Sequence, residues 1–265
     1  MGEFAPDCRR TDGLEGMGAV AMTPYGWHTL FEAAAYMAGF RLFLVLRKRD
    51  AASPLIHSES ALVIAVGAIV GAALGAKLAW MLYDPAYAFT HFPDWRHLLA
   101  GKSIIGALLG GLLGVELVKR ALGVRGSTGD TFALPLMLGM GIGRIGCFLA
   151  GMTDETYGNP TRLPWGVDFG DGIPRHPTQI YEQIFLALWA MLLIRRGPYL
   201  TRPGDRFRAF MIGYLLYRLC IEWIRPIPMW YLGLFSGLQL LCIAGLLYYH
   251  RDIPRLARSL FWARR

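Results

Sequence analysis

Four charged residues lie in parts of the chain that are otherwise strongly apolar. Arg144 is surrounded by glycine and aliphatic residues in the stretch 141–148, Arg218 and Glu222 share a second apolar run, and Glu182 begins a third. A charged side chain at membrane depth costs ~3 to ~10 kcal/mol unless an opposite charge or a water-filled cavity meets it. Guanidinium groups pair with phosphate oxygens through two hydrogen bonds. We therefore expect Arg144 to meet an anionic group, and our hypothesis is a phospholipid head group.

The spacing of Arg218 and Glu222 predicts an ion pair. The two residues are four positions apart, so in a helix they lie on one face. Such a pair can simply hold two helices together. Arg144 and Glu182 lie in two other apolar runs, however, and stability alone does not require several ionisable groups to converge in one bundle. This convergence favours a binding or catalytic site.

A polar block opens the fifth apolar run. It reads Pro174-Arg175-His176-Pro177-Thr178-Gln179-Ile180-Tyr181-Glu182. His176 alone would be interpreted as an interfacial residue bonded to a backbone carbonyl, and Tyr181 as an aromatic anchor at the membrane surface. Gln179 and Glu182 are three residues apart and lie near one helical face. The ordered block is too particular for the two simpler interpretations, so we predict that His176, Gln179, Tyr181 and Glu182 contribute to substrate binding.

The composition indicates how these residues are positioned. Of 265 residues, 54% are hydrophobic and 17% are charged, and the mean hydropathy is +0.37, which is typical of an integral membrane protein. The 32 glycines favour closely packed helices, and therefore an all-α bundle over a barrel. Cys8, Cys147, Cys220 and Cys242 show no paired spacing. The sequence therefore predicts no disulfide framework and no metal site, and no cofactor motif is visible.

Seven apolar runs are close to the ~20 residues that a helix needs to cross a bilayer. They span residues 25–46, 60–83, 102–122, 129–150, 177–196, 207–225 and 230–250. Lysine and arginine gather after the first, third, fifth and seventh runs, which predicts that those ends are cytoplasmic and that the N-terminus faces outward. No removable signal peptide is apparent. The net charge of +8 is explained by these clusters, so no nucleic-acid partner is expected.

This topology divides the chain into three parts. Residues 1–24 are predicted to be an extracytoplasmic tail, residues 25–250 a seven-helix transmembrane domain, and residues 251–265 a basic cytoplasmic tail. The segment 151–176, between the fourth and fifth spans, is rich in glycine and proline turn signals. We expect it to form a small extracytoplasmic cap of short strands or turns.

Five motifs occur in an order that resembles the prolipoprotein diacylglyceryl transferases. They are Gly143-Arg144-Ile145-Gly146-x-Phe148, Glu155-x-Tyr157-Gly158, Leu163-Pro164-Trp165-Gly166-Val167, Pro174-Arg175-His176-Pro177-x-Gln179-x-Tyr181-Glu182 and Arg218-x3-Glu222-x2-Arg225. The chain resembles that family from its first apolar run to its seventh. The resemblance implies a multi-pass enzyme of a bacterial-type inner membrane. It would transfer the diacylglyceryl group of phosphatidylglycerol, or of a related anionic phospholipid, to the lipobox cysteine of a prelipoprotein and release glycerol phosphate.

The resemblance also implies roles for individual residues. Arg144 and Arg218 would hold the phosphate of the leaving group, and Glu222 would orient Arg218. Glu155 and Gly158 would shape the head-group pocket.

Several positions depart from the family pattern and mark the chain as a divergent member. The third-span pattern Gly-x-Ser-x-His-Gly here reads Gly101-Lys102-Ser103-Ile104-Ile105-Gly106, so isoleucine replaces a functionally critical histidine. Cys147 replaces an asparagine, Glu32 replaces a first-span tyrosine, and residues 152–154 look inserted. Three functions therefore stay open. They are transfer to a prelipoprotein, transfer to a small-molecule or lipid acceptor, and non-catalytic phospholipid binding.

His28 and Glu32 offer a substitute for the missing histidine. They are four residues apart near the outer end of the first run, and an imidazole oriented by a carboxylate is a reasonable general base. In the alternative interpretation, His28 is an interfacial residue and Glu32 pairs with Lys77 or Lys102, both of which we expect to line the cavity. Cys147 could act as a nucleophile beside Arg144, although small buried cysteines more often only pack.

Overall fold

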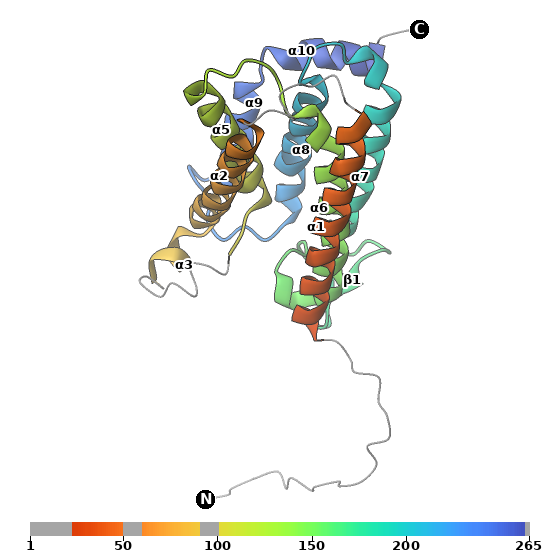
Figure 1. Cartoon of the computed structure of the whole chain (residues 1–265). Coiled ribbons are helices and arrows are strands. Elements are labelled where there is room, and N and C mark those ends of the chain that lie inside the picture. The colour runs from red at the N-terminus through yellow and green to blue at the C-terminus, as the bar shows by residue number, and fades with distance from the viewer. Residues whose placement is uncertain (1–22, 50–59, 91–100, 263–265) are drawn as a thin grey trace, which may run out of the picture.

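The structure is a computed structural model that describes residues 23–49, 60–90 and 101–262, and it is predominantly helical (Figure 1). The long helices are α1 (Pro24–Arg49), α2 (Ser60–Tyr83), α5 (Ile104–Ala121), α6 (Asp130–Ala150), α7 (Thr178–Arg195), α8 (Asp205–Ile221) and α9 (Gly237–Tyr248). Each of them overlaps one of the apolar runs. Within the described ranges, three helical stretches are long and apolar enough to cross a membrane: Pro24–Lys48, Ser60–Tyr83 and Asp130–Asp154.

The remaining elements are short. They are α3 (Pro85–Thr90), the 3-10 helices η2 (Gly151–Asp154), η3 (Gly197–Tyr199) and η4 (Glu222–Ile224), the strands β1 (Val167–Asp168) and β2 (Pro174–Arg175), α10 (Asp252–Ala257) and the π-helix η5 (Arg258–Trp262). The two strands pair antiparallel, with Val167 opposite Arg175. Figure 1 shows β1 near the first turns of α1, at the opposite end of the molecule from α10.

One sequence boundary needs correction. The seventh run was expected to be helical from residue 230, but α9 begins only at Gly237. Tyr231 and Phe235 close a turn just before it, with the Tyr231 amide donating to the Phe235 carbonyl at 2.7 Å. Ser236 then forms a capping box with Gln239, which fixes the start of the helix. The basic segment 251–265, predicted as a tail, contains α10 and η5 over its described residues.

Glycines allow α2 and α5 to pack backbone against backbone. Gly67, Gly71 and Gly75 on α2 face Gly106, Gly110 and Gly114 on α5, so both rows repeat every four residues. A Cβ added at Gly71 would lie 2.3 Å from the carbonyl oxygen of Gly110, which no side chain tolerates. This close approach confirms the expectation drawn from the glycine content, and it is the packing that membrane helices favour.

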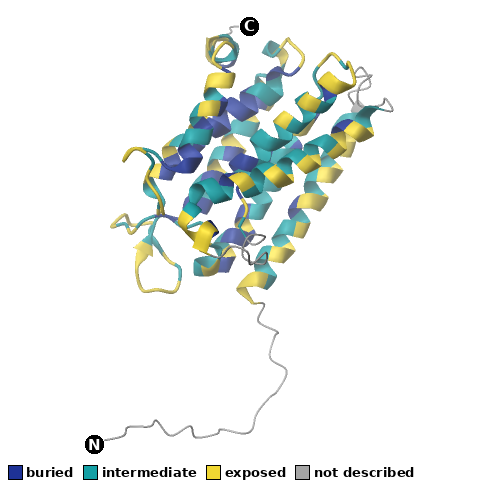
Figure 2. Ribbon diagram, turned by 90° about the vertical axis from the view of Figure 1, so that its left-hand side faces the viewer, coloured by how far each residue is buried: buried dark blue, intermediate teal, exposed yellow. Residues whose placement is uncertain are grey.

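Besides an apolar core, the molecule has two features of burial that are unusual in a soluble protein. Large apolar side chains such as Leu62, Ile69 and Leu78 on α2 are exposed, whereas charged residues on α6, α7 and α8 are buried. Figure 2 shows exposed positions recurring along α1, the helix that continues the N-terminal trace, and buried ones gathered on the helices to its left. An apolar outer surface of this kind suits contact with lipid chains.

Segment 151–176 is held together by its own polar contacts. The Asp168 carboxylate accepts hydrogen bonds from the amides of Gly170 (2.8 Å) and Gly172 (3.0 Å), and Asp171 pairs with Arg175 at 2.5 Å. The hydrogen bond from Arg175 lowers the pKa of the Asp171 carboxyl below its ordinary value. This ordered segment fixes the residues at the mouth of the helix bundle.

Candidate active site

A buried carboxylate on α7 joins two arginines from different helices. The Glu182 Oε2 atom lies 3.0 Å from Nε of Arg144 on α6 and 3.4 Å from Nη1 of Arg218 on α8. Its Oε1 atom accepts a hydrogen bond from the Tyr214 hydroxyl at 2.8 Å. Arg144, Arg218 and Glu182 are 6%, 4% and 3% exposed, so the contacts are made almost entirely without bulk water. The two arginines predicted from sequence to act together therefore do converge.

The C-terminal end of α8 extends this cluster. Arg218 donates to Glu222 at 3.1 Å, as the i and i+4 spacing predicts, and Arg225 lies 3.9 Å from the same carboxylate. Glu222 is completely buried and begins η4, where the helix narrows. We call Arg144, Glu182, Arg218, Glu222 and Arg225 the arginine cluster.

The arginine cluster has an excess of positive charge. Arg144, Arg218 and Arg225 oppose only Glu182 and Glu222, which leaves one positive charge without a matching carboxylate within the cluster. The Nε atoms of Arg218 and Arg225 are buried, and within the described residues they have no hydrogen-bond partner. Buried charges and donors of this kind are costly unless a further group meets them. The cluster is therefore suited to an anion with several acceptor oxygens, such as a phosphate.

A second group of polar residues lies next to Arg144. The Arg144 Nη1 atom contacts Cys147 Sγ at 3.7 Å, and Cys147 shares a small cluster with His28 and Asp154. His28 Nδ1 is 3.0 Å from Asp154 Oδ1, and its Nε2 atom is 3.7 Å from Glu32 Oε2. His28 and Glu32 are thus paired as expected, but the closer carboxylate is that of Asp154.

The two lysines have different partners. Lys102 Nζ lies 3.3 Å from Glu32 Oε1, which also accepts a hydrogen bond from the Tyr36 hydroxyl at 2.9 Å. Lys77 Nζ donates to the Gly101 carbonyl at 2.7 Å. Of the two partners considered for Glu32, the one found beside it is Lys102. Glu32 is therefore a bridge between Lys102 and His28.

Comparison with known proteins identifies the family. The family model described as prolipoprotein diacylglyceryl transferase matches residues 19–249. The chain belongs to this family.

Relatives in the prolipoprotein diacylglyceryl transferase family are identical to this chain at about a third of the aligned positions. Three of them are named phosphatidylglycerol–prolipoprotein diacylglyceryl transferase. The protein of Bordetella avium is 36% identical over 64% of this chain and 65% of its own length. That of Cupriavidus metallidurans is 32% identical over 83% and 82%, and that of Nitratidesulfovibrio vulgaris is 32% identical over 85% and 88%.

The polar block at the start of α7 contacts segment 151–176. His176 Nδ1 lies 3.3 Å from the Tyr181 hydroxyl, which accepts a hydrogen bond from Trp165 Nε1 at 2.8 Å. Gly158 packs beneath His176, where an added Cβ would lie 2.6 Å from the His176 Cβ. His176, Tyr181 and Gly158 therefore brace one another, and none of these contacts reaches the arginine cluster.

Gln179 is held by a neighbour through its amide nitrogen, and Glu155 through its backbone carbonyl. Gln179 Nε2 donates to Thr156 Oγ1 at 3.1 Å, and Thr156 Oγ1 donates to Asp154 Oδ2 at 2.5 Å. Glu155 has a left-handed backbone with φ of 53°, and its carbonyl accepts from Arg225 at 3.5 Å. Segment 151–176 therefore contacts both polar groups of the site. It reaches the group around His28 through Asp154, and the arginine cluster through the Glu155 carbonyl.

Three residues of the site were not predicted from the sequence. Tyr214 is four residues before Arg218, so the same helical spacing that revealed Glu222 would have revealed it. Arg225 stood within a quoted motif but received no role. Asp154 carries no signal in the sequence, because it meets His28 across 126 positions of the chain.

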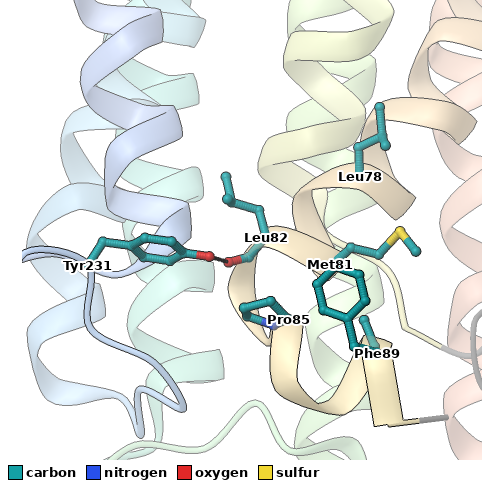
Figure 3. Close-up of a pocket in the computed structure, with 7 residues that line it drawn as sticks. Leu78, Met81, Leu82, Pro85, Phe89 and Tyr231 are labelled. Carbon is teal, nitrogen blue, oxygen red and sulfur yellow. Dashed lines mark hydrogen bonds between the residues drawn. The ribbon is translucent and has the colours of Figure 1, made fainter. Parts of the chain in front are cut away.

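Two other features lie apart from this chemistry. Ile105, at the position where the family pattern has histidine, is only 1% exposed and packs in the apolar core. A groove of about 420 Å³ lies between α2, α3 and the turn before α9 (Figure 3). It is lined by Leu78, Met81, Leu82, Pro85, Ala88, Phe89 and Tyr231, none of which is a predicted site residue. Figure 3 shows the Tyr231 hydroxyl donating to the Leu82 carbonyl, at 2.6 Å.

Proposed function

We propose that this protein transfers the diacylglyceryl group of phosphatidylglycerol to the cysteine thiol of a prelipoprotein, the activity for which its relatives are named. The observation that carries the proposal is the positive excess of the arginine cluster. A phosphate diester supplies the negative charge and the acceptor oxygens that the cluster lacks. Arg144 and Arg218 would be the catalytic residues that contact it, and Glu222 would keep Arg218 oriented.

The arginine cluster would act mainly on the leaving group. As the acceptor sulfur forms a bond to the glycerol carbon, the bond from that carbon to the phosphate oxygen breaks and its electron pair stays on the oxygen. Glycerol phosphate leaves with this additional negative charge. Guanidinium groups fixed in a site of low polarity stabilise such a charge more strongly than the same groups in water. Glu182 would yield part of its contact with the arginines to the phosphate when the lipid binds.

The acceptor would approach from the side of Cys147, the residue that joins the arginine cluster to His28. The thiol must lose a proton as its sulfur attacks, and His28 would accept that proton, since histidine is the most frequent general base in enzymes. Glu32 and Asp154, which flank the ring, would stabilise the imidazolium. We expect Lys77, Lys102, Glu155, Gly158, His176, Gln179 and Tyr181 to shape the surrounding pocket.

The proposal includes seven crossings of a bacterial-type inner membrane, with residues 1–24 and 151–176 outside and 251–265 in the cytoplasm. Three helices satisfy the length and hydropathy for crossing. The positions of the basic residues support the orientation. The opposite ends occupied by β1 and α10 in Figure 1 support it as well. The site would then open toward the outer leaflet.

The test is mass spectrometry of a lipobox peptide incubated with phosphatidylglycerol and the purified protein. A thioether-linked diacylglyceryl peptide and glycerol phosphate are expected. Arg144→Ala and Arg218→Ala should each reduce the yield at least 100-fold, as loss of one transition-state donor does. Arg162→Ala, at an exposed position of segment 151–176, is the matched control. Wild-type turnover by both cluster variants would overturn the proposal.

A different acceptor is the second candidate, because Ile105 stands where the family's histidine is expected and Lys102 and Glu32 form an ion pair at the acceptor end. In that case glycerol phosphate would be released without a modified peptide. If neither product forms, the result indicates a non-catalytic phospholipid-binding protein. A comparison of His28→Ala with His176→Ala then tests the identity of the general base. Only His28→Ala should abolish turnover, and wild-type rates for both variants would show that neither imidazole is the base.

A further inference from the structure

His28, Cys147 and Asp154 form a set of potential metal ligands. His28 comes from α1, Cys147 from α6 and Asp154 from η2, and their nitrogen, sulfur and oxygen atoms all lie within 4.8 Å of one another. We propose that these three side chains bind one divalent transition-metal ion of the zinc class, with a fourth coordination position left for water or another ligand. The sequence predicted no metal site, because these ligands come from three separate elements.

The ligand types and distances suit a tetrahedral site. Zinc is bound by imidazole nitrogen, thiolate sulfur and carboxylate oxygen at roughly 2.0 to 2.3 Å, so ligand atoms around one ion lie roughly 3 to 4 Å apart. The distance of 3.0 Å between His28 Nδ1 and Asp154 Oδ1 is at the short end of this range. The other two pairs of ligand atoms lie within 4.8 Å, which extends slightly beyond its long end. Side-chain shifts of about 1 Å therefore close the site. Three protein ligands with an open fourth position are typical of catalytic rather than structural zinc.

The surroundings support each ligand. The second ring nitrogen of His28 faces the Glu32 carboxylate at 3.7 Å, the arrangement that orients a metal-binding imidazole. The other oxygen of Asp154 accepts a hydrogen bond from Thr156 at 2.5 Å, which holds that carboxylate in place. Arg144 donates to Cys147 Sγ at 3.7 Å, so the sulfur has a fixed hydrogen-bond donor beside it. All three ligands thus have an outer partner.

The local charge also permits a divalent cation. Arg144 and Lys102 are the neighbouring cations, and each is already paired, Arg144 with Glu182 and Lys102 with Glu32. The bound thiolate and the Asp154 carboxylate supply two negative charges to the metal itself. Cys147 is buried, whereas His28 is half-buried and lies in the first turns of α1, so an ion can enter past His28.

Metal binding and base catalysis are alternative states of His28. With Nδ1 bound to a metal and Nε2 facing Glu32, the ring has no nitrogen left to accept a proton. The metal site rests on the His28, Cys147 and Asp154 geometry alone and does not depend on the proposed transfer reaction. It is therefore tested by metal binding rather than by turnover.

The experiment is a titration of the detergent-purified, chelator-treated full-length protein with Co²⁺, followed by displacement with Zn²⁺. We expect one equivalent of Co²⁺ to produce visible ligand-field bands and a near-ultraviolet thiolate-to-metal charge-transfer band. Zn²⁺ should remove both. Cys147→Ser should abolish the charge-transfer band, and His28→Ala and Asp154→Asn should each weaken binding at least 10-fold. Cys242→Ser, at another buried cysteine, and His250→Ala are the matched controls and should bind Co²⁺ like wild type.

A further variant guards against effects of folding. Glu32→Gln retains all three ligands but removes the outer carboxylate, so it should bind Co²⁺ about 10- to 100-fold more weakly while keeping the charge-transfer band. The proposal is overturned if the wild-type protein shows no charge-transfer band. It is also overturned if Cys147→Ser and Cys242→Ser give the same spectrum. A negative result in this titration would not bear on the proposed transfer reaction. A negative result in the transfer assay would likewise not bear on the metal site.

Discussion

Replacing Glu182 with glutamine tests whether the arginine cluster is built to receive an anion. Glutamine keeps the size and shape of the side chain but removes its charge. In the wild type, the Glu182 carboxylate contacts Arg144 at 3.0 Å and Arg218 at 3.4 Å. The substitution leaves Arg218 with its second partner, Glu222, at 3.1 Å. Among the described residues, Arg144 keeps the Cys147 thiol at 3.7 Å as its hydrogen-bond partner, so most of the loss falls on Arg144.

The expected cost follows from the burial of this pair. Removing one partner of a buried ion pair destabilises a protein by about 3–5 kcal/mol. Because Arg218 stays paired, we expect the lower end, about 3 kcal/mol, which corresponds to a fall in Tm of roughly 6–12 °C at 2–4 °C per kcal/mol. The substitution also raises the positive excess of the cluster by one charge. An anionic lipid should therefore stabilise the variant more than the wild type.

Thermal unfolding in detergent, with and without phosphatidylglycerol, measures both effects. Glu182→Gln should melt lower than wild type without lipid and recover a larger part of its stability when lipid is added. Glu116→Gln on α5 is the control, since it removes a carboxylate that lies 2.8 Å from Lys119 and outside the arginine cluster. An anion site in the arginine cluster is refuted if phosphatidylglycerol shifts the Tm of variant and wild type equally. It is also refuted if zwitterionic phosphatidylcholine stabilises the variant as much as phosphatidylglycerol does.

Three further substitutions test the packing and the polar contacts. Gly110→Ala should lower the Tm, with a cost of about 1–3 kcal/mol or more, because its Cβ would lie 2.2 Å from a backbone oxygen, whereas the neighbouring Gly111→Ala meets nothing closer than 3.4 Å and should be near neutral. Asp205→Asn should cost about 1.5–3 kcal/mol in chemical or thermal unfolding, because it weakens the two 2.7 Å hydrogen bonds that Arg255 donates across to α8. Tyr214→Phe should cost about 1 kcal/mol and reduce turnover less than either arginine variant does, since it removes one hydrogen bond to the cluster's carboxylate and no charge.

Contacts within one helix were the part of the site that sequence could predict. Arg218 and Glu222 pair as their spacing requires, and the same rule reaches back to Tyr214. The glycine content likewise anticipated close helix packing, because glycine at intervals of four residues leaves one helical face without side chains. Both features depend only on local geometry, which a single sequence contains.

Contacts between elements were not accessible in the same way. The spacing of residues in the sequence predicted no particular partner for Glu182. Its position between Arg144 and Arg218 depends on how three helices pack. Asp154 is the clearest case, since nothing in its neighbourhood indicated that η2 would bring it to His28. The start of α9 at Gly237 was missed because hydropathy continues through residues 230–236, while the turn that excludes them from the helix depends on backbone hydrogen bonds.

The imbalance of charge distinguishes the arginine cluster from a structural ion network. A network retained only for stability would be expected to match its charges, because each unpaired buried charge costs several kcal/mol. Here three guanidinium groups meet two carboxylates, and the buried Nε atoms of Arg218 and Arg225 lack a hydrogen-bond partner among the described residues. In the proposed function, the missing component is negative, offers several oxygens and reaches a site enclosed by apolar helices. A phospholipid phosphate, carried into the bundle by its own acyl chains, meets all three requirements.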